Sequence, residues 1–202
     1  TGRDLFGKVR ENMDALLDAG IPFKLNAVAM RGFNDDELPA FIDYAMRHPI
    51  DVRFIEFMPM GEGTRWSDSC FWSAPDILDA VKGLVAVAPV EQEQRNGGPA
   101  RLYTLSGPDG PGLGRLGLIS PLSSHFCTSC NRLRITSDGA LRTCLFDDRE
   151  YRLRNALRHP KLGIEAVRRI VTLATRDKPI GARLLERRHN AVAQRRMTAI
   201  GG

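Results

Sequence analysis

The sequence lacks a long hydrophobic run, and no stretch approaches the roughly 18 consecutive apolar residues that span a bilayer. It opens on Thr1-Gly2-Arg3-Asp4, which has no apolar signal region. Four cysteines in 202 residues are too few for a disulfide-based mini-protein, and 19 Gly with 12 Pro are typical of neither collagen nor disordered chains. We therefore expect a globular, cytoplasmic protein that is long enough to bury a core and has no membrane partner.

Acidic residues are scarce in the second half of the chain. Residues 1–100 hold 10 Lys and Arg against 16 Asp and Glu, a balance of −6, whereas residues 101–202 hold 19 against 8, a balance of +11. This asymmetry indicates an anionic partner for the second half, although a solvated basic surface gives the same pattern. In the Arg-rich region 149–196 the one aromatic residue is Tyr151. Proteins that bind single-stranded nucleic acids stack bases on such rings, so we expect no nucleic-acid partner.

Apolar periodicity divides the chain into an α/β part and a loop-rich part. In the first part, helix, strand, helix and strand alternate, which is the rhythm of a parallel α/β barrel or sheet. The helices are predicted over 5–19, with one buried face, and over 35–47, and the strands over 23–30 and 52–58. After Pro59 the pattern predicts antiparallel, loop-rich structure: helices over 75–81, 149–158 and 164–175, strands over 102–105 and 116–119, a hairpin of 133–136 with 140–143, and a basic tail over 183–202.

Three of the four cysteines form the pattern Cys127-x2-Cys130-x13-Cys144. Two thiols on one loop can grip a metal or cluster, and the predicted hairpin brings the third to them, whereas reducing thiol pools disfavour a structural disulfide. The ligand count leaves two sites open: Zn²⁺ with His125 as a fourth ligand, or a [4Fe–4S] cluster with one iron open to a non-protein ligand. Cys70 has no cysteine near it in sequence and is interpreted as a buried apolar residue.

Two arginines, Arg132 and Arg134, follow the second cysteine of this pattern directly. In a strand they project to the same face, and planar guanidinium groups suit phosphate oxygens. The pattern therefore predicts an anion clamp beside the thiols, with two exposed strand arginines as the alternative.

Polar residues also interrupt the first predicted strand. Lys24 and Asn26 are two residues apart, so a strand turns both to one side, where a barrel would present them to a shared cavity. A polar pair satisfied by water near a strand end is the alternative.

Five stretches of the chain carry a family resemblance. The most specific is 117–146, which contains Cys127-Thr-Ser-Cys130-Asn-Arg132-Leu-Arg134 and Leu141-Arg-Thr-Cys144. The others are 53–58, Gly98-Pro-Ala-Arg101, Asp177-Lys178-Pro179 and the ending Met197-Thr-Ala-Ile-Gly201-Gly202. On these stretches, and over nearly its whole length, the chain resembles the GTP 3',8-cyclases, a family of radical S-adenosylmethionine enzymes that perform the first step of molybdenum cofactor biosynthesis.

The resemblance implies a fold and a reaction. The fold is α/β: residues 1–90 form the later part of an incomplete parallel (β/α) TIM-like barrel, and 91–202 form a C-terminal [4Fe–4S]- and GTP-binding region with antiparallel strands, helices and a flexible Gly-Gly tail. The reaction converts GTP to (8S)-3',8-cyclo-7,8-dihydroguanosine 5'-triphosphate through a 5'-deoxyadenosyl radical. GTP and S-adenosylmethionine are then the expected partners, and a homodimer is left open.

The resemblance also implies a role for each matching residue. Cys127, Cys130 and Cys144 match the ligands of a [4Fe–4S] cluster whose open iron takes the guanine of GTP. Gly201-Gly202 matches a glycine tail that reaches into the active site. The residues that match GTP-holding positions are Lys24, Arg132, Leu133 and Arg134. The residues that match positions near S-adenosylmethionine are Asn26, Met58 and the catalytic arginine, Arg53.

One motif of that family is missing from this sequence. The radical-generating [4Fe–4S] cluster needs Cys-x3-Cys-x2-Cys, and no such triplet occurs here. The chain, which does not begin with Met, is therefore interpreted as the C-terminal part of such an enzyme. Alone, it is expected to bind its ligands without turning over.

Two other functions would use the same residues. The first is a zinc-stabilised nucleic-acid-binding module, in which the three cysteines and His125 hold zinc and the basic half meets phosphates. The second is another radical enzyme with an auxiliary cluster and a different substrate. The scarcity of aromatic residues argues against the first, and the Cys130-Asn-Arg-Leu-Arg134 block argues, through the resemblance, against the second.

Overall fold

A computed structural model of the chain describes residues 4–61, 64–91, 98–181, 183–184 and 199–200. The chain divides into two compact units, each built from two stretches of sequence. Unit 1 consists of Thr1–Phe57 and Ser69–Ser124, and unit 2 of Met58–Asp68 and His125–Gly202. None of the described helices is long and apolar enough to cross a membrane.

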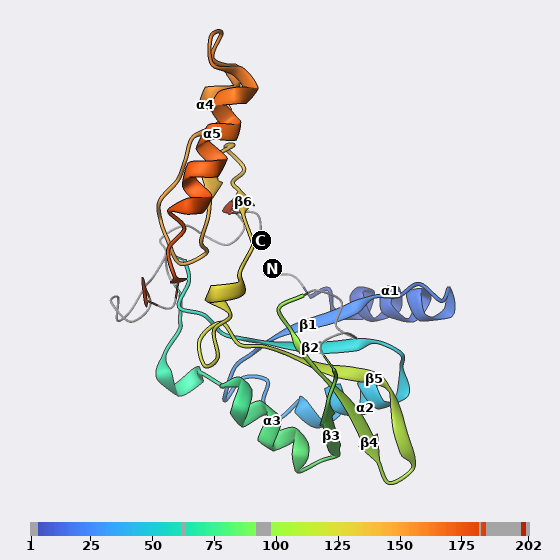
Figure 1. Ribbon diagram of the computed structural model, residues 1–202. Coiled ribbons are helices and arrows are strands. Elements are labelled where there is room, and N and C mark those ends of the chain that lie inside the picture. Colours follow the sequence, from blue (N-terminus) through green and yellow to red (C-terminus); the bar gives the residue numbers. More distant parts are fainter. Residues whose placement is uncertain (1–3, 62–63, 92–97, 182, 185–198, 201–202) are drawn as a thin grey trace. The chain divides into compact units, whose positions relative to one another are not determined.

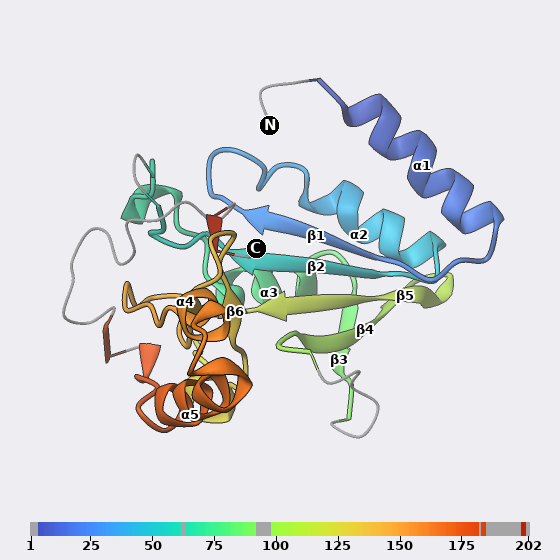
Figure 2. The ribbon, with the colours of Figure 1, turned by 90° about the horizontal axis from the view of Figure 1, so that it is seen from above.

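Unit 1 is built on a mixed β-sheet whose described strands number five (Figure 1). Its helices are α1 (Phe6–Asp18), α2 (Leu38–Arg47) and α3 (Ala74–Lys82). Its strands are β1 (Lys24–Ala29), β2 (Asp51–Glu56), β3 (Ala86–Pro89), β4 (Arg101–Gly107) and β5 (Gly110–Ile119). The strand order is β1-β2-β5-β4-β3, and β2 pairs in parallel with both β1 and β5. The β4 strand is antiparallel to β5 and to β3, and Figure 2 shows β1, β2 and β5 side by side with the same direction.

Unit 2 is built from short elements. Its described elements are a 3-10 turn (Cys127–Ser129), β6 (Arg134–Ile135), β7 (Leu141–Arg142), α4 (Leu153–Arg158) and α5 (Gly163–Arg176). The β6 and β7 strands pair antiparallel, which confirms the hairpin predicted around Ser137-Asp138-Gly139. Gly139 occupies the turn with a φ of 82°, a conformation that favours glycine.

The α/β class and most of the predicted helices and strands are confirmed, with several differences. The strand predicted over 116–119 is longer and runs parallel to β2, whereas the sequence favoured antiparallel structure there. Its glycines resemble a loop, but a side chain at Gly114 would come within 2.7 Å of the Ala45 carbonyl oxygen of α2, so glycine permits close packing. The β3 strand was not predicted. A barrel is not seen among the described strands, which form an open sheet, and the TIM-like barrel stays a prediction.

A further difference concerns α1, for which the sequence predicts one buried face. None of its residues is buried, and Phe6 is 76% exposed. Leu17, in its last turn, packs partly against the core. The described residues of unit 1 therefore cover the end of this apolar face but not its beginning.

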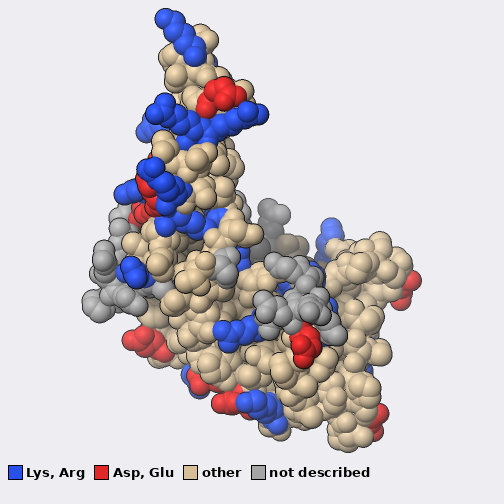
Figure 3. Space-filling model, in the orientation of Figure 1, with Lys and Arg blue, Asp and Glu red and all other residues tan. Residues whose placement is uncertain are grey.

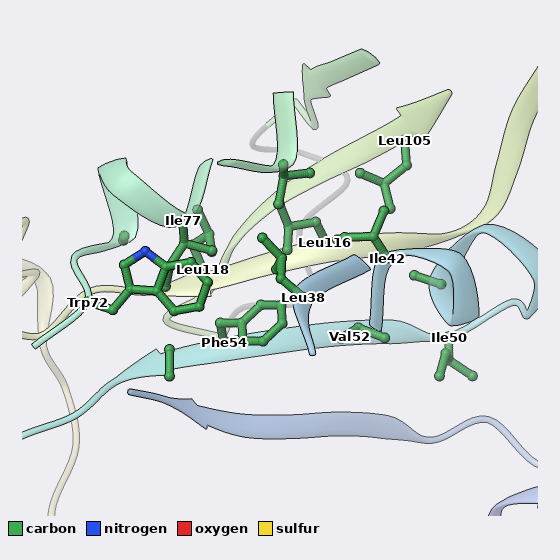
Figure 4. Close-up of a cluster of buried hydrophobic side chains, with 14 residues drawn as sticks. Leu38, Ile42, Ile50, Val52, Phe54, Trp72, Ile77, Leu105, Leu116 and Leu118 are labelled. Carbon is green, nitrogen blue, oxygen red and sulfur yellow. The ribbon is translucent and has the colours of Figure 1, made fainter. Parts of the chain in front are cut away.

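The main core of unit 1 lies on the face of the sheet that α2 and α3 cover (Figure 4). Alternate residues of β2 and β5 point into it, as strand geometry requires, and α2 supplies one row of apolar side chains at helical spacing. The residues labelled in Figure 4 include Val52 and Phe54 of β2, Leu116 and Leu118 of β5, and Leu38 and Ile42 of α2.

A buried carboxylate, Glu56, lies at the end of β2 and is 1% exposed. It accepts hydrogen bonds from the backbone N–H of Ala74 at 2.8 Å, of Leu122 at 2.8 Å and of Ser123 at 3.0 Å, and from the Ser123 hydroxyl. Because charge is costly to bury without such donors, Glu56 fixes the start of α3 and the loop after β5 to the end of β2.

We expect Glu56→Gln to lower the free energy of unfolding by about 3 kcal/mol, because the amide nitrogen would face backbone N–H donors that need an acceptor. The measurement is urea unfolding followed by circular dichroism and by tryptophan fluorescence, to which the buried Trp72 contributes. Glu11→Gln, on an exposed position of α1, is the control. Equal stabilities of the two variants would contradict the role given to Glu56.

Candidate functional site

The opposite face of the unit 1 sheet carries polar side chains near its β1 edge. The register pairs Lys24 with Asp51 and Asn26 with Arg53 across β1 and β2. In β1, Lys24, Asn26 and Val28 are exposed while the intervening residues face the core. The prediction that a strand turns Lys24 and Asn26 to one side is therefore confirmed, and Arg53 shares that side.

Arg53 belongs to a buried ionic network on this face. Asp51, which is 5% exposed, accepts a hydrogen bond from Arg53 Nη2 at 2.7 Å and another from Arg115 Nε at 2.7 Å. Burial tends to raise the pKa of Asp51, but the two arginines outweigh it and hold the pKa below the usual value of 3.8. The network fixes the orientation of Arg53 across the middle of the sheet.

Gly117, opposite Arg53 on β5, provides the space that this arginine needs. An added Cβ at Gly117 would lie 2.7 Å from Arg53 Cγ, which is closer than atoms can approach. The side chain of Arg53 therefore crosses β5 where β5 has no side chain of its own.

Unit 2 brings two of the three predicted cysteines close to one glycine, Gly181. All four cysteines of the chain are half-buried thiols, and Cys127 and Cys130 bracket the 3-10 turn, while Cys144 follows β7. A Cβ at Gly181 would lie 2.9 Å from Cys144 Sγ and 3.7 Å from Cys127 Sγ, so these two thiols line the same small space.

The three predicted cluster ligands, Cys127, Cys130 and Cys144, fit a cluster in their chemistry but not in their arrangement. Three soft thiols suit a thiolate-bound cluster in their chemistry. As the described residues stand, however, no three His, Cys, Asp or Glu side chains form a group that could hold a metal ion. The assignment of Cys127, Cys130 and Cys144 as cluster ligands therefore stays a prediction.

Two of the thiols have different electrostatic surroundings. Burial tends to raise the pKa of Cys130, but the Arg132 backbone N–H and the Lys178 ammonium outweigh it and lower that pKa below its ordinary value. Burial raises the pKa of Cys144, and the nearby Cys127 adds to the rise. Of these two thiols, Cys130 is thus better prepared as a thiolate than Cys144.

Arg132 and Arg134 lie beside these thiols, although their strand is shorter than predicted. Because β6 begins at Arg134, Arg132 lies before the strand, with its Cζ 4.7 Å from the centre of the Phe126 ring. Arg134 is half-buried opposite Arg142, and burial together with Arg132 lowers its pKa. Leu133 is 41% exposed. The result is a concentration of positive charge next to the thiols, which is the property the predicted anion clamp needs.

Several other predicted residues are placed differently. His125, the candidate fourth zinc ligand, is exposed. Cys70 lies in unit 1 and is half-buried rather than buried, with its carbonyl accepting the Arg31 N–H at 3.0 Å. Met58 is half-buried in unit 2. Gly201 and Gly202 lie outside the described residues, as does most of the predicted basic tail.

Basic side chains also gather over α4 and α5 of unit 2 (Figure 3). They are exposed and include Arg152, Arg154, Arg158, Lys161, Arg168, Arg169 and Arg176. Much of the positive balance of the second half therefore lies on a solvated surface, as the alternative interpretation of the charge asymmetry has it.

Sequence reasoning missed the residues that position the others. Asp51, Arg115 and Gly117 hold Arg53, and Gly181 approaches two of the thiols. A carboxylate at the start of an apolar strand was the available signal for Asp51, because buried charge requires a partner. Gly181 carries no sequence signal of its role, because its contacts are more than thirty residues away in the chain.

Together, the fold and the site define an α/β protein with a loop rich in cysteine and arginine. The chain belongs to the Molybdenum Cofactor Synthesis C family, which matches residues 50–184. It is 43% identical to the GTP 3',8-cyclase of Alkaliphilus oremlandii over 203 residues, which are 100% of this chain and 59% of the relative. It is 41% identical to that of Syntrophomonas wolfei over 180 residues, 89% of this chain and 53% of the relative. To that of Streptomyces coelicolor it is 37% identical over 203 residues, 100% of this chain and 58% of the relative.

These relatives confirm the resemblance drawn from the sequence motifs. The chain spans a little over half the length of the curated relatives it matches, and the matched stretch is a C-terminal portion of them.

We expect the Asp51 network to make the stability of unit 1 depend on acid. Because the folded pKa of Asp51 lies below its unfolded value, its stabilisation is complete above about pH 4 and is lost as the pH falls through the folded pKa. At neutral pH, Asp51→Asn should cost on the order of 3 kcal/mol, because it leaves Arg53 buried without its carboxylate.

The measurement compares urea unfolding of the wild type and Asp51→Asn from neutral pH down to about pH 3. Their difference in free energy of unfolding should shrink at the acid end. Asp14→Asn, in the exposed pair with Arg10, is the control and should change little. A difference that stays constant down to the acid end would contradict the assignment.

Proposed function

We propose that this chain is the GTP-holding part of a GTP 3',8-cyclase, the name that its relatives carry. The complete enzyme would convert GTP to (8S)-3',8-cyclo-7,8-dihydroguanosine 5'-triphosphate by 5'-deoxyadenosyl radical chemistry in molybdenum cofactor biosynthesis. The observation that carries the proposal is the meeting, in one loop region of unit 2, of three thiols and two half-buried arginines. An anion held there would lie beside a soft-ligand site.

In this proposal, Cys127, Cys130 and Cys144 hold a [4Fe–4S] cluster. When bound, it supplies an iron that is open to a non-protein ligand, for which guanine is the proposed occupant. Gly181 has no side chain that would crowd the thiols of Cys127 and Cys144, and the Cys130 pKa is already lowered, after the opposing effect of burial, by Arg132 and Lys178. These features support ligation of a cluster by the three thiols.

Arg132, Leu133 and Arg134 are proposed to hold the nucleotide. Guanidinium groups keep their charge at working pH and bind phosphate oxygens in pairs. Arg134 is half-buried and lies near the positive charges of Arg132 and Arg142, so an anion would relieve like-charge repulsion there. The main task of these residues is to position GTP and exclude water.

The polar face of unit 1 is proposed to serve the same reaction. Lys24 would contact GTP and Asn26 would contact S-adenosylmethionine, as would Met58 of unit 2. Arg53 is the proposed catalytic arginine, and its ionic bond to Asp51 holds it in one orientation before any ligand arrives. Such preorganisation reduces the entropy lost on binding.

The absence of Cys-x3-Cys-x2-Cys supports a limit on this proposal. We infer that the chain by itself binds its ligands without turnover, and that a second [4Fe–4S] cluster belongs to the part of the relatives that the chain does not match. The division into a partial barrel at 1–90 and a cluster- and GTP-binding region at 91–202 is part of the proposal. The cytoplasmic location and the homodimer also belong to the proposal.

We expect the anaerobically reconstituted chain to contain about four irons and four sulfides with broad visible absorption. Cys127→Ala, Cys130→Ala and Cys144→Ala should each reduce the iron content and the absorption strongly. Cys70→Ala is the matched control, since Cys70 lies in unit 1, and it should leave both unchanged. A colourless protein with about one zinc would overturn the cluster and favour the zinc-stabilised module.

Arg134→Ala should weaken the binding of GTP about 10- to 100-fold, because it removes charge-assisted hydrogen bonds to phosphate. Anaerobic isothermal titration calorimetry of the cluster-loaded chain measures this. Arg158→Ala, on the exposed end of α4, removes the same charge from the same unit and should change the affinity little. Equal losses in the two variants would indicate a general charge effect instead of a site.

A further inference from the structure

In the short segment that follows α5, Lys178 donates a hydrogen bond to Cys130, and the backbone at Gly181 passes close to Cys144 and Cys127. We propose that Lys178 is a positioning residue that ties Cys130 and the Arg132 backbone into one fixed loop, so that the cluster ligand and the nucleotide-binding arginine are set by the same side chain. This inference rests on the proposed function and names a residue to which the matching motifs give no role.

The hydrogen bonds of Lys178 converge on a single stretch of the loop. Its Nζ donates to the Cys130 carbonyl oxygen at 2.7 Å, to the Arg132 carbonyl oxygen at 3.0 Å and to Cys130 Sγ at 3.4 Å. An ammonium group has three donors, and these contacts use all of them. The planar donor fork of an arginine could not reach three acceptors around one point in the same way.

The charge of Lys178 is compensated within this loop. Lys178 is half-buried, and none of the ion pairs found among the described residues joins it to a carboxylate. Its electrostatic partners are the two carbonyl dipoles and the Cys130 sulfur. A cation in this place suits a sulfur ligand that carries negative charge, and a hydrogen bond to a ligand sulfur tunes the cluster it holds.

Gly181 completes the contact from the same segment. It is buried, and a Cβ there would lie 2.9 Å from Cys144 Sγ and 2.9 Å from Phe146 Cδ2. The backbone therefore passes close to Cys144 and Cys127 three residues after Lys178 holds Cys130. The segment acts as a two-point strap across the cysteine loop, with Lys178 as the polar point and Gly181 as the steric one.

The consequence is a coupling between two ligands. Because Lys178 bonds to residues 130 and 132, its removal should disturb both the cluster environment and the position of Arg132. A lysine that merely filled space would affect neither the potential of the cluster nor the nucleotide selectively. The reduction potential of the cluster should fall when Lys178 is removed, because the loss of a positive hydrogen-bond donor near a cluster lowers its potential.

The experiment compares Lys178→Met, Lys178→Arg and the control Lys161→Met, whose lysine is exposed in the same unit. Each chain is reconstituted anaerobically, and three quantities are measured: the cluster reduction potential by electron paramagnetic resonance, the affinity for GTP, and amide hydrogen exchange over residues 127–134 in the cluster-free chain. We expect Lys178→Met to lower the potential, to weaken GTP binding roughly tenfold and to speed exchange in the loop. Lys178→Arg should recover more of the potential than of the GTP affinity.

The outcomes separate this inference from the proposed function. If the wild type binds a cluster and Lys178→Met matches Lys161→Met in potential and affinity, the role of Lys178 is wrong while the proposed function stands. If the wild type binds no cluster, the proposed function fails, and unchanged hydrogen exchange in Lys178→Met would then overturn the inference separately. If Lys178→Met does not fold, the same measurements are made on Lys178→Arg and on Gly181→Ala. Gly181→Ala should reduce the cluster content, because its added methyl group crowds Cys144.

Discussion

The burial of charge on β2 is the constraint on which unit 1 depends. The β2 strand lies inside the sheet, and three of its charged residues are less than a tenth exposed: Asp51, Arg53 and Glu56. Each charge has to be matched, because a buried ion without partners would cost more than the whole fold gains. On one face of the sheet, Glu56 accepts hydrogen bonds from the start of α3 and from the loop after β5. On the other face, Asp51 accepts a hydrogen bond from Arg115. Arg53, which is proposed to meet ligands, is thus also part of the ionic network that joins β2 to β5.

Unit 2 differs from unit 1, because polar contacts hold its described part together where unit 1 has an apolar core. Its described part buries few large apolar side chains, among them Leu141, Phe146 and Ile200. Arg142 is fully buried and donates to the Asp147 carbonyl oxygen, while Lys178 holds the cysteine loop. A unit built in this way would gain rigidity from a ligand bound by its thiols, since a ligand that prefers the folded state stabilises it.

Much of this structure could be predicted from local pattern. The helices, the first two strands and the β6–β7 hairpin follow from apolar spacing and turn residues, and the shared face of Lys24 and Asn26 follows from the strand period alone. The direction of β5 could not be predicted, because its glycines resemble a loop and their reason is contact with other elements, such as the approach of Gly114 to α2. The contacts of Lys178 with Cys130 also escaped, because 48 residues separate the two in sequence and nothing local indicates their meeting.

The close approach of Gly117 to Arg53 has a consequence for how this chain can change. Residues 53 and 117 share one volume, since a Cβ at 117 would lie 2.7 Å from Arg53 Cγ. They lie on neighbouring strands and behave as one steric unit: a larger residue at 117 requires a smaller one at 53, and the loss of Arg53 releases Asp51 from half of its ionic bonds. Natural variation or a designed library would have to alter the two positions together. Any side chain introduced at 117 would displace the guanidinium-bearing side chain of residue 53 on the neighbouring strand.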